Sequence, residues 1–198
     1  MARAHDDTSA ALVTAAHRLL ANEGPDALTV RRIANEAGMS TMNVYSRFGG
    51  KDGVIDELHH DGFERLVAAI DQVPHTESAV ADLIAMATAY REFAVAHPRY
   101  YEIMFGAWPA TNPRRRTPDG LGRYLRRVEQ SVDEIALPHE LEPRSAAVWM
   151  WATCHGMVSL ELNGLADESV DWSHVYDSGV HAAVEGLARH AGLTTPHA

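Results

Sequence analysis

Apolar residues recur every three or four positions along most of the chain, which is the spacing of one face of an α-helix. We find no alternating run of β-branched residues bounded by turn residues, which would predict a strand. Proline and glycine divide the periodic pattern into segments of helical length. We therefore predict an all-α chain of about nine helices.

The second and third predicted helices are short and follow each other closely. The second begins after Thr29 as its N-cap and closes at Gly38, since glycine readily takes the left-handed conformation that ends many helices. The third starts after Ser40 or Thr41 and ends near Phe48. Two short helices joined by a tight, glycine-containing turn form a helix-turn-helix.

Longer helical segments follow residue 50. The fourth helix is predicted from Lys51 to Val73, where Pro74 stops it, and the fifth ends at His97-Pro98. The remaining predicted elements are one or two turns over 100–105, a loop over 106–120, and helices over 121–135, 144–165 and 173–191. This organisation predicts a three-helix head over residues 1–50 and a helical body over residues 51–198.

The distribution of charge also separates the N-terminal head from the rest of the chain. The formal net charge is −10, yet residues 1–55 carry six basic and six acidic side chains, so the excess of acid lies in the remainder. A chain with this net charge does not attract nucleic acid as a whole. Any nucleic-acid site must therefore be local, and the neutral head is where we expect it.

Several classes of protein are excluded by simple absences from the sequence. The single cysteine, Cys154, allows neither an internal disulfide nor a cysteine metal site. The sequence holds no uninterrupted apolar run long enough to span a membrane and no signal-peptide core. Its twelve histidines include no His-x-x-x-His pair. We predict a cytoplasmic protein with no membrane partner, no metal and no cofactor.

The helix-turn-helix has the side chains that a DNA-reading element needs. Thr41, Met42 and Asn43 are placed on the outer side of the third helix. Asn43 can read adenine and Met42 can touch a thymine methyl, or either can fill space against the groove wall. Tyr45 and Lys51, the only lysine of the chain, are placed to reach backbone phosphates.

The run from Leu28 to Ser40, followed by Val44 to Asp52, resembles the DNA-binding head of TetR-family transcriptional regulators. The resemblance implies a three-helix head on a helical body that binds ligand and dimerises. Such a protein usually acts as a repressor that a small molecule releases from a DNA operator. The DNA-binding residues predicted on this basis are Thr29, Arg31, Ser40, Thr41, Met42, Asn43, Tyr45, Arg47 and Lys51.

Two positions depart from the family pattern. Arg47 stands where an aromatic residue or histidine commonly precedes the phenylalanine, and we expect it to add a phosphate contact. Gly49-Gly50 replaces the usual proline-containing turn, and we expect it to loosen that turn.

The body shows a second resemblance. Trp151, His155 and Gly156 are similar to the signature of the WHG-type C-terminal domain found in one branch of the family. The surrounding helix, residues 146–158, is apolar nearly all round, so it must be covered on more than one side. A second subunit on one face and a ligand cavity on another would cover it. We predict a homodimer through the last two helices, built as a four-helix interface.

Aromatic and methionine residues of the body are candidates for an effector cavity, or else ordinary core packing. For His155 we favour a hydrogen-bonded core histidine over a metal ligand, and such a histidine can still line the cavity. The candidate ligand-binding residues are Met86, Tyr90, Phe93, Met104, Phe105, Trp108, Tyr124, Trp151 and His155. A cluster of arginines is a second nucleic-acid site, a site for an anionic effector or, as we favour, a solvated surface. It comprises Arg114, Arg115, Arg116, Arg123, Arg126 and Arg127.

An enzyme is the main competing class, and its signatures are missing. The chain has no Gly-x-Ser-x-Gly elbow and no complete phosphate loop. Cys154 and His155 are neighbours on a helix and therefore point about 100° apart, so they cannot form a nucleophile and base pair. We predict a DNA-binding regulator released by an apolar or amphipathic effector. A helical protein-protein interaction module without DNA binding is the alternative, and it leaves the neutral head unexplained.

Overall fold

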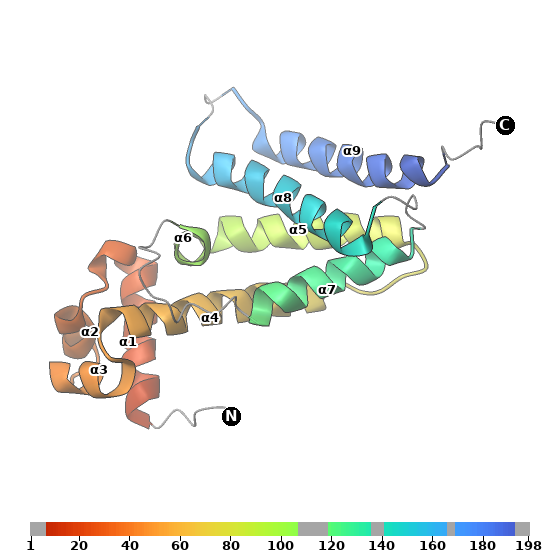
Figure 1. Cartoon of the computed structure of the whole chain (residues 1–198). Helices are drawn as coiled ribbons and strands as arrows, with labels where there is room; N and C mark the ends of the chain where they lie inside the picture. Colours follow the sequence, from red (N-terminus) through yellow and green to blue (C-terminus); the bar gives the residue numbers. More distant parts are fainter. Residues whose placement is uncertain (1–6, 107–118, 136–140, 166–168, 193–198) are drawn as a thin grey trace. The chain divides into compact units, whose positions relative to one another are not determined.

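The computed structural model describes residues 7–106, 119–135, 141–165 and 169–192, and over these residues the chain is helical with no strand (Figure 1). The all-α prediction of about nine helices is confirmed. The elements are α1 (Asp7–Glu23), η1 (Pro25–Ala27, a 3₁₀ turn), α2 (Val30–Glu36), α3 (Thr41–Phe48), α4 (Lys51–Asp71), α5 (Ala79–Ala96), α6 (Pro98–Phe105), α7 (Asp119–Asp133), α8 (Pro143–Leu162) and α9 (Trp172–Gly192).

Proline and glycine set several of these boundaries. Pro98 and Pro143 each occupy the first turn of their helix, where the missing N–H has no intrahelical partner to lose. α8 ends at Leu162, slightly before the predicted end, because Gly164 follows in the left-handed conformation with φ at 61°.

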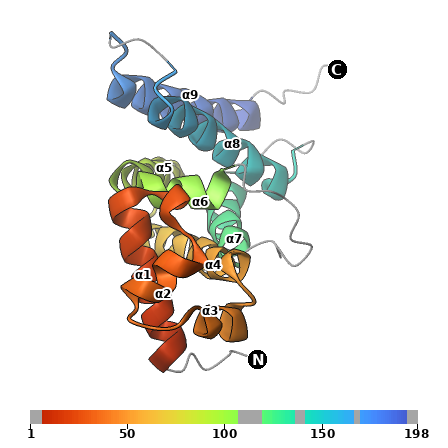
Figure 2. The ribbon, with the colours of Figure 1, turned by 90° about the vertical axis from the view of Figure 1, so that its left-hand side faces the viewer.

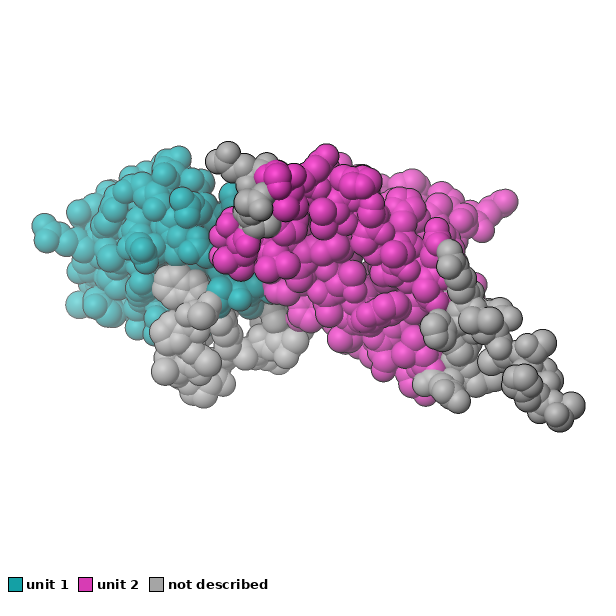
Figure 3. Space-filling model, turned by 90° about the horizontal axis from the view of Figure 1, so that it is seen from above, with its two compact units in different colours: residues 1–65, 97–118 teal, residues 66–96, 119–198 magenta. Residues whose placement is uncertain are grey.

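The contacts divide the chain into two compact units (Figure 3). Unit 1 comprises residues 1–65 and 97–118, and unit 2 comprises residues 66–96 and 119–198. α4 begins in unit 1 and ends in unit 2, while α6 belongs to unit 1 although it follows α5 in the sequence. The predicted division into a DNA-binding head (residues 1–50) and an effector-binding body (residues 51–198) concerns function, and it stays a prediction.

Unit 1 is built on α1, which contacts η1, α2, α3 and α6 (Figure 2). The helical periodicity of each segment places its apolar side chains in one shared core. The fully or almost fully buried members include Leu12, Leu20, Leu28, Ile33, Val44, Val54, Leu58 and Ile103. This core holds α2 and α3 in a fixed relation to α1.

Unit 2 is a layered helical bundle in which α5 contacts α7, α8 and α9, and α8 contacts both α7 and α9. Tyr176 of α9 donates a hydrogen bond of 2.7 Å to the Ala87 carbonyl of α5. Arg91 of α5 forms a two-pronged ion pair with Glu161 of α8 (2.6 and 2.9 Å) and also donates to Ser173 at the start of α9. These polar contacts tie three helices together across a largely apolar bundle.

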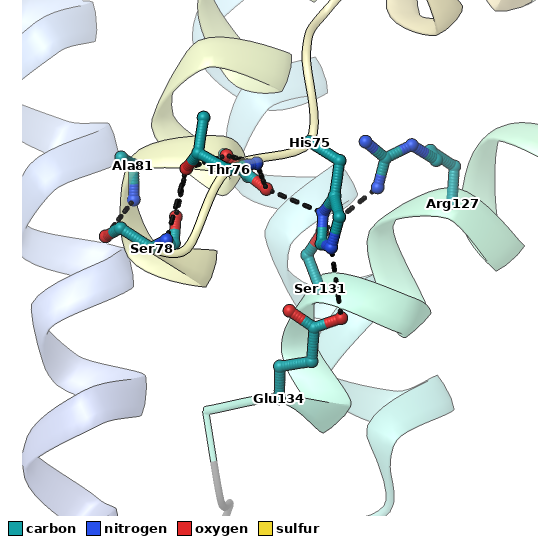
Figure 4. Close-up of polar contacts among 8 residues, drawn as sticks. His75, Thr76, Ser78, Ala81, Arg127, Ser131 and Glu134 are labelled. Carbon is teal, nitrogen blue, oxygen red and sulfur yellow. Dashed lines mark hydrogen bonds and ion pairs between the residues drawn. The ribbon is translucent and has the colours of Figure 1, made fainter.

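The start of α5 is fixed by the buried carboxylate of Asp82, whose partners His75 and Thr76 are labelled in Figure 4. Asp82 accepts hydrogen bonds from the backbone and hydroxyl of Thr76 and contacts Nδ1 of His75 at 2.9 Å. Nε2 of His75 lies 3.8 Å from Glu134, the residue that follows α7. Hydrogen bonds from Thr76 are the main cause that lowers the pKa of Asp82. The connection between α4 and α5 is therefore held to the first turns of α5.

Candidate nucleic-acid interface

The turn between α2 and α3 has the geometry that the sequence predicts. Thr29 is the N-cap of α2, and its hydroxyl accepts from the Arg32 amide at 3.3 Å. Gly38 has φ at 66°, and the amides of Gly38 and Met39 donate to the Asn35 and Ala34 carbonyls. This pair of bonds is a Schellman motif, in which a left-handed glycine closes the helix. The motif ends α2 and reverses the chain direction within a few residues, so that α3 can begin at Thr41.

One side of α3 is exposed to solvent and carries both polar and apolar side chains. The opposite side packs on the core through Val44. Val44 is fully buried, whereas Met42 is 70% exposed and Tyr45 is 56% exposed. Thr41 is exposed as well. Met42 and Tyr45 thus add apolar contact surface to the exposed side of α3.

Asn43 is oriented by the residue that precedes the helix. Its Nδ2 donates to the Ser40 hydroxyl at 3.2 Å, and its backbone amide donates to the Ser40 carbonyl at 3.0 Å. Ser40 is the N-cap residue of α3, although its hydroxyl serves Asn43 and not a backbone amide. An amide nitrogen carries two hydrogens, so the contact leaves one donor and the amide oxygen to pair with a base edge.

The turn from α3 to α4 depends on three glycines. Gly49 and Gly50 both have positive φ, at 75° and 132°. A Cβ on Gly53 would lie 1.8 Å from the Phe48 carbonyl oxygen, so the backbones of α3 and α4 touch there. Tyr45 covers the same turn, with ring carbons 3.7 and 3.9 Å from the Cβ position of Gly50. The double glycine thus supplies a conformation that the turn requires.

The cationic side chains of the head lie in different surroundings. Arg31 is exposed on α2, and Lys51 is half-buried at the first residue of α4. Arg47 is also half-buried, and its Nη1 donates to the Ser9 hydroxyl of α1 at 3.5 Å. Arg32, which the sequence analysis did not select, pairs with Glu23, and this hydrogen bond raises its pKa. The predicted phosphate contact of Arg47 therefore has an intramolecular competitor.

Among the candidate ligand-binding residues, a subset of unit 2 comes together around Tyr90. Trp151 Nε1 donates to the Tyr90 hydroxyl at 3.3 Å, and that hydroxyl lies 3.3 Å from Nδ1 of His155. Nε2 of His155 lies 3.4 Å from the Ser159 hydroxyl. The ring of Tyr124 lies 5.6 Å from that of Tyr90. Desolvation lowers the pKa of His155, which favours the neutral ring that these contacts use.

The other candidates are distributed differently. Met86 and Phe93 are buried in unit 2, whereas Met104 and Phe105 belong to unit 1, where the ring of Phe105 lies 5.3 Å from that of Phe63. Trp108 and Arg114–Arg116 lie outside the described residues. A surface groove of about 510 Å³ runs beside the end of α4 and α5, and none of the nine candidates lines it.

An apolar surface on the last two helices was only partly anticipated. It comprises Val148, Trp149 and Leu160 of α8, Val175 of α9, and Leu165 between the two helices, all 39–70% exposed, and we call it the α8–α9 face. Ala152 and Gly156 are exposed between Trp149 and Leu160 at helical spacing on α8. The all-round apolarity of residues 146–158 was the signal in the sequence, but it did not say which side is exposed.

Three further properties of the described residues concern a thiol, metal ligands and membrane spans. Burial raises the pKa of the Cys154 thiol to about 11, so it is protonated and unreactive at neutral pH. Within the described ranges, no three His, Cys, Asp or Glu side chains converge as metal ligands would. None of the described helices combines the length and apolarity that a bilayer crossing needs.

Comparisons with known proteins agree with this geometry. Residues 12–58 match the family model described as bacterial regulatory proteins of the tetR family, and residues 83–183 match the tetracyclin repressor-like C-terminal domain. The second match includes Trp151, His155 and Gly156. A relative, the HTH-type transcriptional regulator Rv1816 of Mycobacterium tuberculosis, is 25% identical over 94% of this chain and 95% of its own.

Solved structures show the same fold. A Rhodococcus protein of unknown function aligns with a TM-score of 0.73 at 25% identity, covering 94% of this chain and 98% of its own. A single-residue variant of TetR from Acinetobacter baumannii, solved in complex with minocycline, aligns with a TM-score of 0.68 at 19% identity, covering 93% of this chain and 97% of its own.

Proposed function

Because the chain belongs to the TetR family of DNA-binding transcriptional regulators, we propose that it is a homodimeric repressor that places its two α3 helices in successive major grooves of a palindromic operator. The observation that carries this proposal is the outer face of α3. Met42 and Tyr45 are exposed on it while Val44 holds its inner side in the core. Thr41 and Asn43 complete a set of side chains suited to base edges.

Selection of bound sequences from a random duplex pool tests the proposal. Enrichment of a palindrome with half-sites about 34–36 Å apart, or a multiple of that spacing, is the expected result. Recovery of no preferred sequence at low salt would favour the alternative, a helical interaction module.

The α8–α9 face supports dimerisation through the last two helices. Two copies of this face can pack as a four-helix interface with the same residues on both sides. Small side chains at Ala152 and Gly156 allow helices to approach closely, with Trp149 and Leu160 as flanking apolar contacts. Covering these side chains removes a large exposed apolar surface of unit 2 from water.

The effector that releases the operator is an apolar or amphipathic small molecule in this proposal. The aromatic cluster around Tyr90 supports it, because Tyr90, Trp151 and His155 offer a few polar atoms among apolar side chains. The Acinetobacter protein in the fold comparison carries a small molecule, minocycline. Repeating the duplex selection with candidate apolar compounds would identify an effector by loss of the enriched palindrome.

Asn43→Ala should relax specificity at one base pair of each half-site. Loss of a bidentate amide contact costs about 1–3 kcal/mol of discrimination against the wrong base. The measurement is affinity for the operator and for single-base variants of it. Ser46→Ala, on the exposed side of α3, is the control. Equal losses by Asn43→Ala on operator and random duplex would contradict a reading role.

Lys51→Ala should weaken binding to all sequences alike. A lost phosphate contact reduces the slope of log affinity against log salt by about one. Titrations of specific and random duplex across a salt series measure this slope. The same titration of Arg47→Ala tells whether Arg47 contacts phosphate or acts only through Ser9. An unchanged slope for Lys51→Ala would remove it from the interface.

A further inference from the structure

A polar cluster in unit 1 joins three helices around one histidine. Nε2 of His17 on α1 lies 3.0 Å from Asp61 Oδ2 on α4, and its Nδ1 is hydrogen-bonded to the Tyr100 hydroxyl of α6. Arg65, one turn after Asp61, donates to the same carboxylate at 3.1 Å and places its guanidinium 5.2 Å from the Tyr100 ring centre. All four side chains belong to unit 1. We call this set the His17 cluster.

When His17 is neutral, its contacts specify one tautomer of the ring. Asp61 can only accept, so Nε2 must carry the hydrogen, and Nδ1 then accepts the hydrogen of the Tyr100 hydroxyl. Burial raises the pKa of Tyr100, so this hydroxyl stays protonated and can donate. A proton added to Nδ1 would put two donors face to face, and the hydroxyl of buried Tyr100 would have to turn away and lose its acceptor.

The surrounding charges act on His17 in both directions. Desolvation lowers its pKa, Asp61 opposes this, and Arg65 adds to it, with a net lowering from 6.5. On α6 the facing group is Tyr100, whose ring also meets the ring of His97 edge-on at 6.3 Å. On α1 the neighbouring charged residue is Arg18, which lies 3.8 Å from Glu36.

The cluster sits where it can control the reading helix. α1 contacts α2 and α3, and α4 follows α3 through the glycine turn at which their backbones touch. His17 therefore joins the helix on which α2 and α3 pack to the helix that directly follows α3. The cluster is also distinct from the residues assigned to DNA.

We propose that His17 is a positioning residue for DNA binding: its neutral ring, held on one side by Asp61 of α4, clamps α6 to α1 through the Tyr100 hydroxyl, and protonation in mild acid breaks the bond to Tyr100 and weakens operator binding. This rests on the proposed function. For a histidine whose pKa is lowered by folding, the stabilising contribution is present above 6.5 and is lost as the pH falls through the lowered pKa.

The test compares operator affinity from pH 7.5 to 5.5 for the whole protein and two variants. His17→Gln keeps a donor for Asp61 but cannot gain a proton, so its affinity should fall less than that of the natural protein by about threefold or more at the acid end. His60→Gln, an exposed histidine on α4, is the matched control and should retain the natural profile. Superimposable profiles for His17→Gln and the natural protein would overturn the proposal.

A second readout does not need DNA. Nitrogen NMR of the His17 ring should show the Nε2–H tautomer and a pKa below 6.5. Tyr100→Phe removes the bond that protonation breaks, so it should raise the pKa of His17. A pKa of His17 at or above 6.5, or one that Tyr100→Phe does not change, would contradict the proposed clamp. If the duplex selection finds no operator while the NMR result holds, the proposed function fails and the clamp survives as a property of unit 1.

Discussion

Gly156→Arg is expected to make the protein monomeric and to lower its affinity for a palindromic operator about 100-fold or more. Gly156 is exposed on α8, and a Cβ placed on it meets no atom within 4 Å. The protomer therefore has room for the larger residue, and a helix interior gains up to about 1 kcal/mol when glycine is replaced. In the proposed dimer the same position faces the partner, where a desolvated guanidinium without a counter-ion is costly.

The size of the effect comes from losing two-site binding. Linked half-site contacts exceed a single one by about 10²–10⁴ in apparent affinity. The added positive charge would favour DNA, so a loss cannot be attributed to electrostatics. Gly156→Ala is the control that preserves a close approach. Sedimentation measures the assembly state and titration of the operator measures affinity; a dimeric Gly156→Arg would place the interface elsewhere.

Ile33→Ala should lower the free energy of unfolding of unit 1 by about 2–5 kcal/mol. Ile33 is fully buried on α2, and its side chain belongs to the core that α1, α3, α4 and α6 share. Removing it leaves a cavity beneath the helix-turn-helix. Ile33→Val deletes a single methylene and should cost about 0.5–1.5 kcal/mol. If the loss of stability comes from packing, Ile33→Val should cost less than Ile33→Ala. If any substitution at this position is harmful, the two costs should be similar.

Denaturant titration and hydrogen exchange of α2 and α3 amides measure this loss, because exchange reports unit 1 separately from unit 2. Val95→Ala on α5 is the control, since Val95 is 44% exposed and its truncation should stay within about 0.5 kcal/mol. Apparent DNA affinity should also fall for Ile33→Ala, because a smaller fraction of the protein has a folded DNA-binding head. Equal costs for Ile33→Ala and Val95→Ala would mean that the core is placed wrongly.

Local rules predicted much of the fold and of the reading helix. The 3.6-residue period indicated the helices, and Thr29 and Gly38 marked the ends of α2 because capping and left-handed glycine are properties of adjacent residues. The fold and the family assignment are confirmed by the structure and the comparisons. The DNA-binding, ligand-binding and dimer residues stay predictions.

Long-range packing is what the sequence could not supply. The period of α6 showed a helix but not that it joins α1 in unit 1, so Met104 and Phe105 were grouped with residues of unit 2. The bond from Arg47 to Ser9 and the contact of His17 with Asp61 link residues more than thirty positions apart. No spacing rule relates such pairs, because they depend on how helices cross.

At Gly53 the backbone of α4 lies directly against the Phe48 carbonyl of α3, so the two helices are in close contact where they join. We therefore expect a rotation of the first turns of α4 to carry α3 with it. Any side chain at Gly53 would collide with the Phe48 carbonyl oxygen, so this position requires glycine. A variant meant to retune the response should keep these glycines and change the residues that hold the later turns of α4.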